Sequence, residues 1–256
     1  MTDDIYFDGR TDRLRKNIYS TAKGILRIRL VQDDLSRFLP TERKLHVLDV
    51  GGGLGQMSIM LAELGHEVTY CEPTDEMRAA ASKAFEEAGH GQIRVLAEPL
   101  QELVARGKPQ YDLVLVHAVL EWLARPEEAM KGIPNLLAPG GWLSLMYFNL
   151  HSIILRNLLR GNFRKVLSGD YAGEAGGLTP LNPLDPGDVK QWLDTVGLEV
   201  LEETGIRSFS DYLPRDVARQ RNIEELYALE RDFSHKEPYR SMARYIHVIA
   251  RKPHDP

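Results

Sequence analysis

The chain has 256 residues, of which 43% are apolar, and a formal net charge of −5. This length and composition allow a sizeable buried core, so they exclude a small binding module and predict one large α/β domain with appendages. No run of about 18 apolar residues occurs and no apolar stretch follows the charged start, so we expect no membrane span and no signal peptide. The single cysteine, Cys71, fits a protein of the reducing cytoplasm.

Short apolar runs alternate with helix-like segments from residue 46 onward. This alternation predicts an α/β fold with a seven-stranded, mostly parallel sheet and helices on both of its faces. The strand-like runs are 46–50, 67–71, 93–97, 112–117, 142–148, 198–206 and 245–250, and the helix-like segments are 55–64, 75–88, 99–106, 126–137 and 187–196.

Three stretches fall outside this alternation. They are a helical lead-in at 1–44 and two insertions, at 149–186 and 211–243. Insertions at the carboxyl ends of strands lie over the ligand crevice of such a sheet. We therefore expect a single domain over 1–256 in which the three stretches form a helical cap.

The first strand-like run ends in a cluster of glycines, in the sequence VLDVGGGLGQ at 47–56. A strand, a glycine loop and a helix in this order bring a ligand close to the backbone. A dinucleotide fingerprint would need a third glycine at position 56, where the chain has Gln56. The spacing Gly51-x-Gly53-x-Gly55 instead resembles the first motif of the Rossmann-like class I methyltransferases, which use S-adenosylmethionine.

Further candidate residues follow the next three strand-like runs. Glu72 lies about twenty residues beyond the glycines, the distance at which a carboxylate accepts hydrogen bonds from ribose hydroxyls. Leu100 and Gln101 occupy the place where such folds enclose an adenine. His117 ends the fourth run, where three roles stay open: a packed histidine, a cofactor contact or a general base.

Basic residues are concentrated in the predicted cap, although the whole chain is acidic. The segment 151–167 has four of them and no acidic residue, and Arg156 and Arg160 are spaced to share a helix face. A basic cap is typical of a protein that binds a phosphate backbone, and the alternative is a set of solvated helix faces. The basic residues of the cap and its borders are Arg10, Arg13, Arg15, Lys16, Lys23, Arg27, Arg29, Arg156, Arg160, Arg164, Lys165, Arg207, Arg215, Arg219, Arg221, Arg240 and Arg244.

Seven stretches spread over nearly the whole chain carry a resemblance to one enzyme family. They are KNIYSTAKGILR at 16–27, VLDVGGGLGQ at 47–56, HAVLEWLARPEEAM at 117–130, LAPGGWLSLMYFN at 137–149, RGNF at 160–163, TGIRSFSDYL at 204–213 and EPYRSMARYIHVIARKP at 237–253. In these stretches the chain resembles the bacterial tRNA 5-carboxymethoxyuridine methyltransferases. The resemblance implies S-adenosylmethionine as the cofactor. The expected cofactor contacts are Arg27, Gly51, Gly52, Gly53, Glu72, Leu100, Gln101 and His117.

The reaction that the resemblance implies is methyl transfer to the carboxylate of 5-carboxymethoxyuridine at the wobble position, in the tRNA anticodon loop. A carboxylate is already ionised at pH 7, so we expect no general base, no metal and catalysis by placement of the reacting oxygen. One arginine or lysine, aided by a hydroxyl, should hold the carboxylate through a single oxygen, because the other oxygen must attack. The candidates for these contacts are Tyr19, Lys23, Arg207, Arg244 and Tyr245.

Two other functions stay open from the sequence. A small-molecule O- or C-methyltransferase would use the same cofactor, but its cap would normally be apolar. A non-catalytic RNA-binding protein that depends on S-adenosylmethionine would show a damaged crevice. The sequence does not indicate the oligomeric state.

Overall fold

A seven-stranded sheet forms the centre of the computed structural model, which describes residues 4–7, 9, 11, 21–40, 42–106, 110–173 and 179–254. The strand order is β3-β2-β1-β4-β5-β7-β6. All neighbours are parallel except β7, which pairs antiparallel with both β5 and β6. The strands are β1 (His46–Val50), β2 (Glu67–Cys71), β3 (Arg94–Leu96), β4 (Tyr111–His117), β5 (Leu137–Phe148), β6 (Glu199–Ile206) and β7 (Tyr245–Arg251).

The direction of strand succession reverses between β1 and β4. The chain moves outward from β1 to β2 and β3, then crosses back to place β4 on the other side of β1. In parallel sheets a ligand crevice opens at such a switch point, outside the carboxyl ends of the strands. Val50 and His117, the last residues of β1 and β4, therefore mark the entrance to a site.

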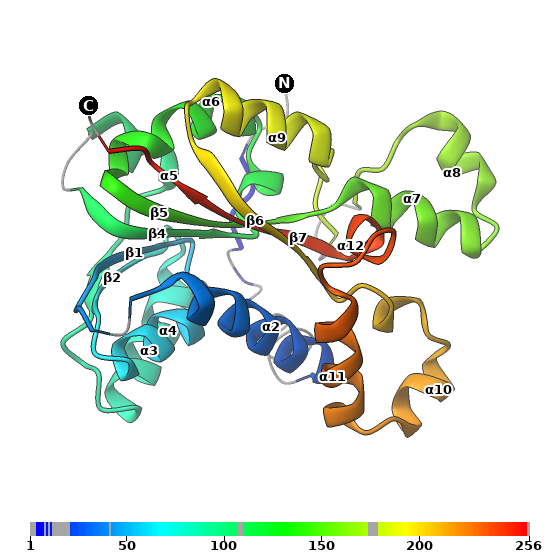
Figure 1. Ribbon diagram of the computed structural model, residues 1–256, viewed down its shortest axis with the longest axis horizontal. Helices are drawn as coiled ribbons and strands as arrows, with labels where there is room; N and C mark the ends of the chain where they lie inside the picture. The colour runs from blue at the N-terminus through cyan, green and yellow to red at the C-terminus, as the bar shows by residue number, and fades with distance from the viewer. Residues whose placement is uncertain are drawn as a thin grey trace.

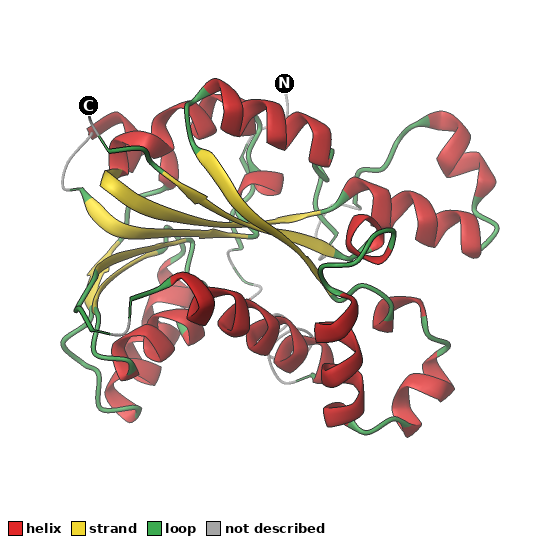
Figure 2. Cartoon of the chain, in the orientation of Figure 1, coloured by secondary structure: helices red, strands yellow, loops and turns green. Residues whose placement is uncertain are grey.

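Helices cover both faces of the sheet (Figure 2). On one face, α2, α3 and α4 bury Leu30, Leu61 and Phe85 against β1 and β4. On the other face, α5, α6 and α9 bury a second apolar cluster that includes Met130 and Leu193. These helices are α2 (Ala22–Phe38), α3 (Gln56–Glu63), α4 (Asp75–Glu87), α5 (Leu100–Arg106), α6 (Pro126–Gly132) and α9 (Pro186–Thr195).

The cap is formed by helices that extend beyond the carboxyl end of β5 (Figure 1). Asn149 caps the first of them, since its side chain accepts a hydrogen bond from His151 N at 2.9 Å. The same side chain donates to the carbonyls of Ser241 and Ala243, which ties two parts of the cap together. The cap helices are α7 (Leu150–Leu159), α8 (Phe163–Ser168), α10 (Arg215–Gln220), α11 (Ile223–Phe233) and α12 (Tyr239–Met242).

Most predicted elements agree with the structure, and two differ. The helix expected over 126–137 ends at Gly132 and is followed by a 3-10 turn, η3 (Ile133–Leu136), because Pro134 has no N–H to continue an α-helix. In the lead-in, residues 4–7 are not helical, and α2 begins at Ala22, after the N-cap Thr21. No helix in the described part of the chain has the length and apolarity that crossing a bilayer requires.

Candidate active site

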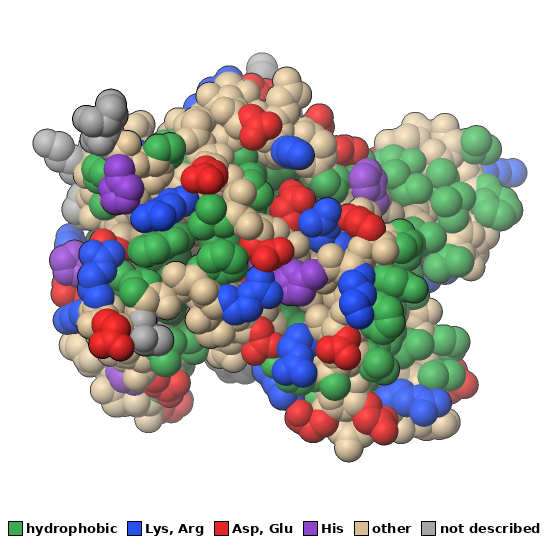
Figure 3. All heavy atoms as spheres, viewed as in Figure 1, with side chains coloured by type: hydrophobic (Ala, Val, Ile, Leu, Met, Phe, Trp, Pro, Cys, Tyr) green, Lys and Arg blue, Asp and Glu red, His purple; other side chains and the backbone are tan. Residues whose placement is uncertain are grey.

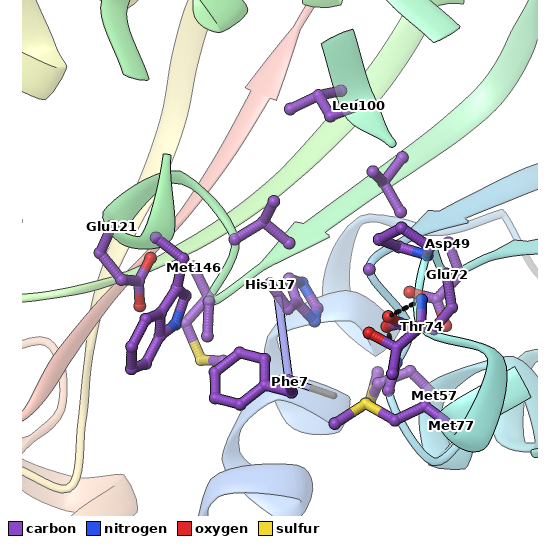
Figure 4. A pocket seen from close by; sticks show the side chains of 18 of the residues that line it. Phe7, Asp49, Met57, Glu72, Thr74, Met77, Leu100, His117, Glu121 and Met146 are labelled. Carbon is purple, nitrogen blue, oxygen red and sulfur yellow. Dashed lines mark hydrogen bonds between the residues drawn. The ribbon is translucent and has the colours of Figure 1, made fainter. Parts of the chain in front are cut away.

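One pocket lies at the carboxyl ends of β1, β2 and β4. In Figure 4, Asp49, Glu72 and Thr74 lie on one side of His117, while Glu121 and Met146 lie on the other side. We call these sides the Glu72 end and the Glu121 end. All eight residues predicted to contact a cofactor line this pocket: Arg27, Gly51, Gly52, Gly53, Glu72, Leu100, Gln101 and His117.

The glycine loop needs its glycines for steric reasons. Gly51 has a φ of 63°, and a Cβ there would lie 2.6 Å from Val119 Cγ2. A Cβ on Gly52 would lie 2.7 Å from the ring of Tyr70. Gly51 N donates to the carbonyl of Cys71 at 2.7 Å, which holds the loop against the end of β2. The loop therefore presents bare backbone to the pocket.

Two buried carboxyl groups lie at the Glu72 end. Glu72 accepts hydrogen bonds from Gly53 N at 3.2 Å and Thr74 N at 3.0 Å, one on each oxygen. Burial raises the pKa of Glu72, and these backbone donors oppose the rise. Asp49 accepts from the Ser58 hydroxyl at 2.7 Å, and burial raises its pKa to about 6. Glu72 is thus fixed in place with lone pairs left for a ligand's hydroxyls.

A chain of hydrogen bonds crosses the sheet and ends at His117. His117 Nε2 lies 2.8 Å from Ser144 Oγ, Ser144 Oγ lies 2.8 Å from His247 Nε2, and His247 Nδ1 lies 2.8 Å from Asp34 Oδ2. Burial lowers the pKa of His117 well below its ordinary value, and His247 and Arg27 add to this. His117 is therefore neutral.

The N-terminal segment lies across the pocket. Asp4 accepts from the Gln101 side chain at 2.5 Å and from Ala124 N at 2.7 Å. The rings of Phe7 and Trp122 pack edge to face with centroids 4.6 Å apart. Trp122 is thus a wall of the crevice. The segment also binds Gln101, so this side chain has only its Oε1 without a hydrogen-bond partner in the described structure.

Glu121 lies at the opposite end of the pocket, and the sequence reasoning missed it. It belongs to η2 (Leu120–Trp122), the turn that follows β4, and it is 1% exposed. Its Oε1 accepts a hydrogen bond from Phe148 N at 3.1 Å, while its Oε2 has no partner among the described residues. Burial raises the pKa of Glu121 to about 8, so the side chain carries a proton at neutral pH.

Three of the predicted substrate contacts converge on Asp211 instead of lining the pocket. Lys23 Nζ lies 2.5 Å from Asp211 Oδ1, Arg207 pairs with Oδ2, and Arg244 Nε lies 3.8 Å from Oδ2. Burial acts to raise the pKa of Asp211, but Arg207, Arg244 and Lys23 lower it well below its ordinary value. Asp211 was not anticipated from the sequence. With Arg156, whose positive charge also acts on Asp211, these residues form what we call the Asp211 cluster.

The Asp211 cluster lies directly behind one wall of the pocket. The Arg244 guanidinium is 4.2 Å from the ring centroid of Phe148, and that of Arg207 is 5.7 Å from the ring of Tyr245. Phe148 and Tyr245 both line the pocket. The Nε atoms of Arg156, Arg207 and Arg244 are buried without a hydrogen-bond partner in the described structure. The cluster therefore carries more positive charge than its single carboxylate neutralises.

Other basic residues of the predicted cap differ in their surroundings. Arg29 is paired with Glu224 at 2.7 Å, and Arg240 with Glu237 at 2.8 Å. Arg160 and Arg164 are exposed on the arm formed by α7 and α8. Tyr19 and the basic residues at 10–16 lie outside the described residues, so the predictions for them stay predictions.

Several polar atoms along the pocket are buried without a partner in the described part of the chain. They include the acceptors Gln56 Oε1, Thr74 Oγ1 and Gln101 Oε1, whose residues line the pocket together with Glu72. Buried acceptors of this kind are normally satisfied by a ligand or water. The Glu72 end therefore fits a nucleoside, which offers hydroxyl and amino donors.

Comparison with known proteins agrees with this geometry. A model of the methyltransferase domain family matches residues 25–203. The tRNA 5-carboxymethoxyuridine methyltransferase of Escherichia coli strain K12 is 39% identical over 96% of this chain and 96% of its own. The ubiquinone biosynthesis O-methyltransferase of Caulobacter sp. strain K31 is 33% identical over 41% of each chain.

The fold also matches a solved structure at low sequence identity. A Burkholderia thailandensis 1,6-didemethyltoxoflavin-N1-methyltransferase, solved with its substrate and S-adenosylhomocysteine, has a TM-score of 0.55 at 19% identity, covering 97% of this chain and 84% of its own. The similarity to the Escherichia coli enzyme extends beyond the sheet, because it spans the cap as well. The chain belongs to the methyltransferase domain family and, within it, to the family of the tRNA 5-carboxymethoxyuridine methyltransferases.

Proposed function

We propose that this protein transfers a methyl group from S-adenosylmethionine to the carboxylate of 5-carboxymethoxyuridine at the tRNA wobble position, giving the methyl ester. The observation that carries the proposal is the 39% identity to the Escherichia coli enzyme over 96% of both chains, cap included. A tRNA substrate also implies that the protein acts in the cytoplasm.

The Glu72 end would hold the cofactor. Glu72 would accept from the two ribose hydroxyls, and Gly51 and Gly52 would bring the backbone against the ligand. Leu100 and Gln101 would enclose the adenine, with the Gln101 Oε1 acceptor facing its amino group. The resemblance to the family assigns Arg27, Gly53 and His117 to the same ligand.

Bound S-adenosylmethionine supplies a methyl group on a positively charged sulfur, which a carboxylate oxygen displaces in line. The carboxylate is ionised at neutral pH, so the protein has no proton to remove from it. The neutral state of His117 is consistent with a positioning role. The described residues would then act by placing the acceptor and by excluding water, and the segment that packs Phe7 on Trp122 covers the pocket for this purpose.

The cap would receive the anticodon loop. The Asp211 cluster puts surplus positive charge behind the pocket wall formed by Phe148 and Tyr245, where it attracts an anionic group without taking up both of its oxygens. Lys23, Arg207 and Arg244 would thus act on the substrate carboxylate through the wall, while Tyr245 would touch the substrate.

The arm of α7 and α8 suits single-stranded RNA. Figure 3 shows hydrophobic side chains gathered on this lobe, and Phe163 is 59% exposed there. The exposed Arg160 and Arg164 lie on the same arm. Exposed aromatic rings next to arginines bind unpaired bases by stacking while the arginines contact phosphates.

The test is methyl transfer with two tRNA pools. Purified protein is incubated with labelled S-adenosylmethionine and either tRNA that carries 5-carboxymethoxyuridine or tRNA from cells unable to make this nucleoside. Label should enter only the first pool. Equal labelling of both pools, or of neither, would contradict the proposal, and transfer to a small aromatic alcohol alone would favour a small-molecule methyltransferase.

A further inference from the structure

Glu121 is a buried acid at the end of the pocket that the cofactor contacts leave free. Its Oε1 is held by Phe148 N, so the carboxyl group cannot rotate away, and its Oε2 has no partner among the described residues. The residue lines the pocket together with Trp122. Figure 4 shows it on the same side of His117 as Met146. A buried acid with one oxygen anchored and the other aimed into a pocket is positioned to meet a ligand.

The groups that face Glu121 do not neutralise it as an anion. Phe148 of β5 offers only a backbone N–H, and His117 of β4 is neutral. Tyr245 of β7 lines the pocket without a charge. Arg27 of α2 acts on Glu121 across the pocket, but its effect is smaller than the effect of burial. In this setting the carboxyl group keeps its proton, which leaves a donor on the free oxygen.

We propose that Glu121 determines specificity for the modified uridine by donating one hydrogen bond, from its free carboxyl oxygen, to one oxygen of the substrate carboxylate. The inference deepens the function proposed above and rests on it. A single O–H donor binds only one carboxylate oxygen, so the second oxygen stays free to attack the methyl group. A tRNA without the carboxymethoxy group leaves this buried donor unpaired, which disfavours its binding.

A neutral donor suits this reaction better than a direct cation. Transfer of a methyl group from a sulfonium to a carboxylate removes both charges, so the transition state is less charged than the bound reactants. A guanidinium in contact with the carboxylate would stabilise the reactants more than the transition state and would slow the step. Glu121 orients the oxygen with a weaker effect on its charge, and the Asp211 cluster supplies attraction from behind the wall.

The experiment is the equilibrium binding of two tRNAs at different pH values. In the presence of S-adenosylhomocysteine, the affinities of carboxymethoxylated and unmodified tRNA are compared from pH 6 to pH 9.5 for the wild type and for Glu121→Gln, Glu121→Ala and the exposed control Glu127→Gln. The wild type should prefer the modified tRNA by about 10- to 100-fold at pH 6.5, the range for a hydrogen bond to a charged group. This preference should fall above pH 8 as Glu121 ionises.

The variants test whether the hydrogen-bond donor of residue 121 causes the preference for the modified tRNA. Glu121→Gln keeps an acceptor for Phe148 N and a donor for the ligand, so it should retain the preference at every pH. Glu121→Ala should lose it at every pH, and Glu127→Gln should behave as the wild type. A wild-type preference that does not change up to pH 9.5 overturns the proposal, and so does an alkaline fall that persists in Glu121→Gln.

Thermal unfolding gives a readout that does not depend on RNA. The pKa of Glu121 is raised from 4.5 in the unfolded chain to about 8 in the folded protein, so ionisation destabilises the fold as pH rises between these values. The stability of Glu121→Gln relative to the wild type should therefore increase from pH 5 to pH 8. A difference in stability that stays the same from pH 5 to pH 8 would show that Glu121 is not protonated in the folded protein. A wild type that transfers no methyl group and shows no preference at any pH refutes the proposed function itself.

Discussion

The two ends of the pocket are built in different ways. At the Glu72 end, the ligand groups come from strand ends and the turns that follow them, such as Gly51 after β1 and Glu72 after β2. At the Glu121 end, they come from the turn after β4, from the ends of β5 and β7, and from the cap. The Glu72 end is built by the sheet and its turns. The Glu121 end instead depends on segments that are far apart in the sequence, such as Lys23 and Asp211, which are 188 residues apart.

The two ends also differ in what holds their charged groups in place. Glu72 is held by two backbone N–H groups, one on each carboxyl oxygen. The arginines behind the Glu121 end are held by one carboxylate, Asp211, which is itself positioned by the cap. Glu230 of α11 accepts hydrogen bonds from Ser208 N at 2.5 Å and Ser210 N at 2.8 Å, which fixes the turn that leads to Asp211. Damage to the cap should therefore affect the two ends unequally.

The largest expected effect is at the Glu72 end. Glu72→Ala would remove the two proposed ribose contacts and leave two backbone donors unpaired, so S-adenosylmethionine should bind about 100-fold or more weakly, as expected for the loss of two hydrogen bonds to a carboxylate. Isothermal titration calorimetry measures this. Glu63→Ala, an exposed acid on α3, is the control. Unchanged cofactor affinity in Glu72→Ala would show that the cofactor does not bind at this end of the pocket.

The second effect is on stability. Asp211→Ala leaves Arg207, Arg244 and Lys23 without their shared anion and should destabilise the protein by about 3–5 kcal/mol, the loss expected when one partner of a buried pair is removed. Urea unfolding at pH 7 measures the free energy. The exposed Asp216→Ala should change it by less than about 0.5 kcal/mol.

The pH dependence of the same variant has a definite sign. The pKa of Asp211 is lowered on folding, so its contribution is complete above its ordinary value of 3.8 and is lost as pH falls toward the folded value. The gap between the wild type and Asp211→Ala should therefore shrink on acidification below pH 4. A gap that grows in acid would show that the cations do not depend on this carboxylate.

A smaller effect is expected in the hydrogen-bonded chain behind His117. Ser144→Ala breaks the contact that orients His117, and His117→Ala would remove the proposed cofactor contact, so each should weaken cofactor binding by about tenfold, the loss of one hydrogen bond. The double variant should be no weaker than either single variant, because both act through the same group. Additive losses would separate Ser144 from the role of His117.

The smallest effect belongs to the exposed arm. Arg160→Ala and Arg164→Ala should each weaken tRNA binding by about two- to fivefold at moderate salt and reduce the salt slope by about one, if each arginine contacts one phosphate. Arg125→Ala, next to α6, should leave the slope unchanged. A salt slope that is the same in all three variants would indicate that the RNA binds to another surface.

The sequence was more informative about the sheet than about the cap. The glycine spacing and Glu72 are close in sequence and follow adjacent strands, so a periodic pattern was enough to bring them together. Asp211 escaped notice because an isolated acid in an insertion has no spacing signal, and its partners come from α2, from the turn after β6 and from the residue before β7. Glu121 was part of the quoted HAVLEWL stretch, but burial, which gives it its chemistry, is not visible in a single sequence.

The chemical identity of the product tests the central claim most directly. Labelled methyl groups transferred to tRNA are treated with mild alkali, which hydrolyses a methyl ester and releases volatile methanol but leaves methyl groups on ring atoms or ribose in place. The structure and the proposed site predict that nearly all of the label becomes volatile. Label that stays on the nucleoside after alkali would contradict methylation of a carboxylate.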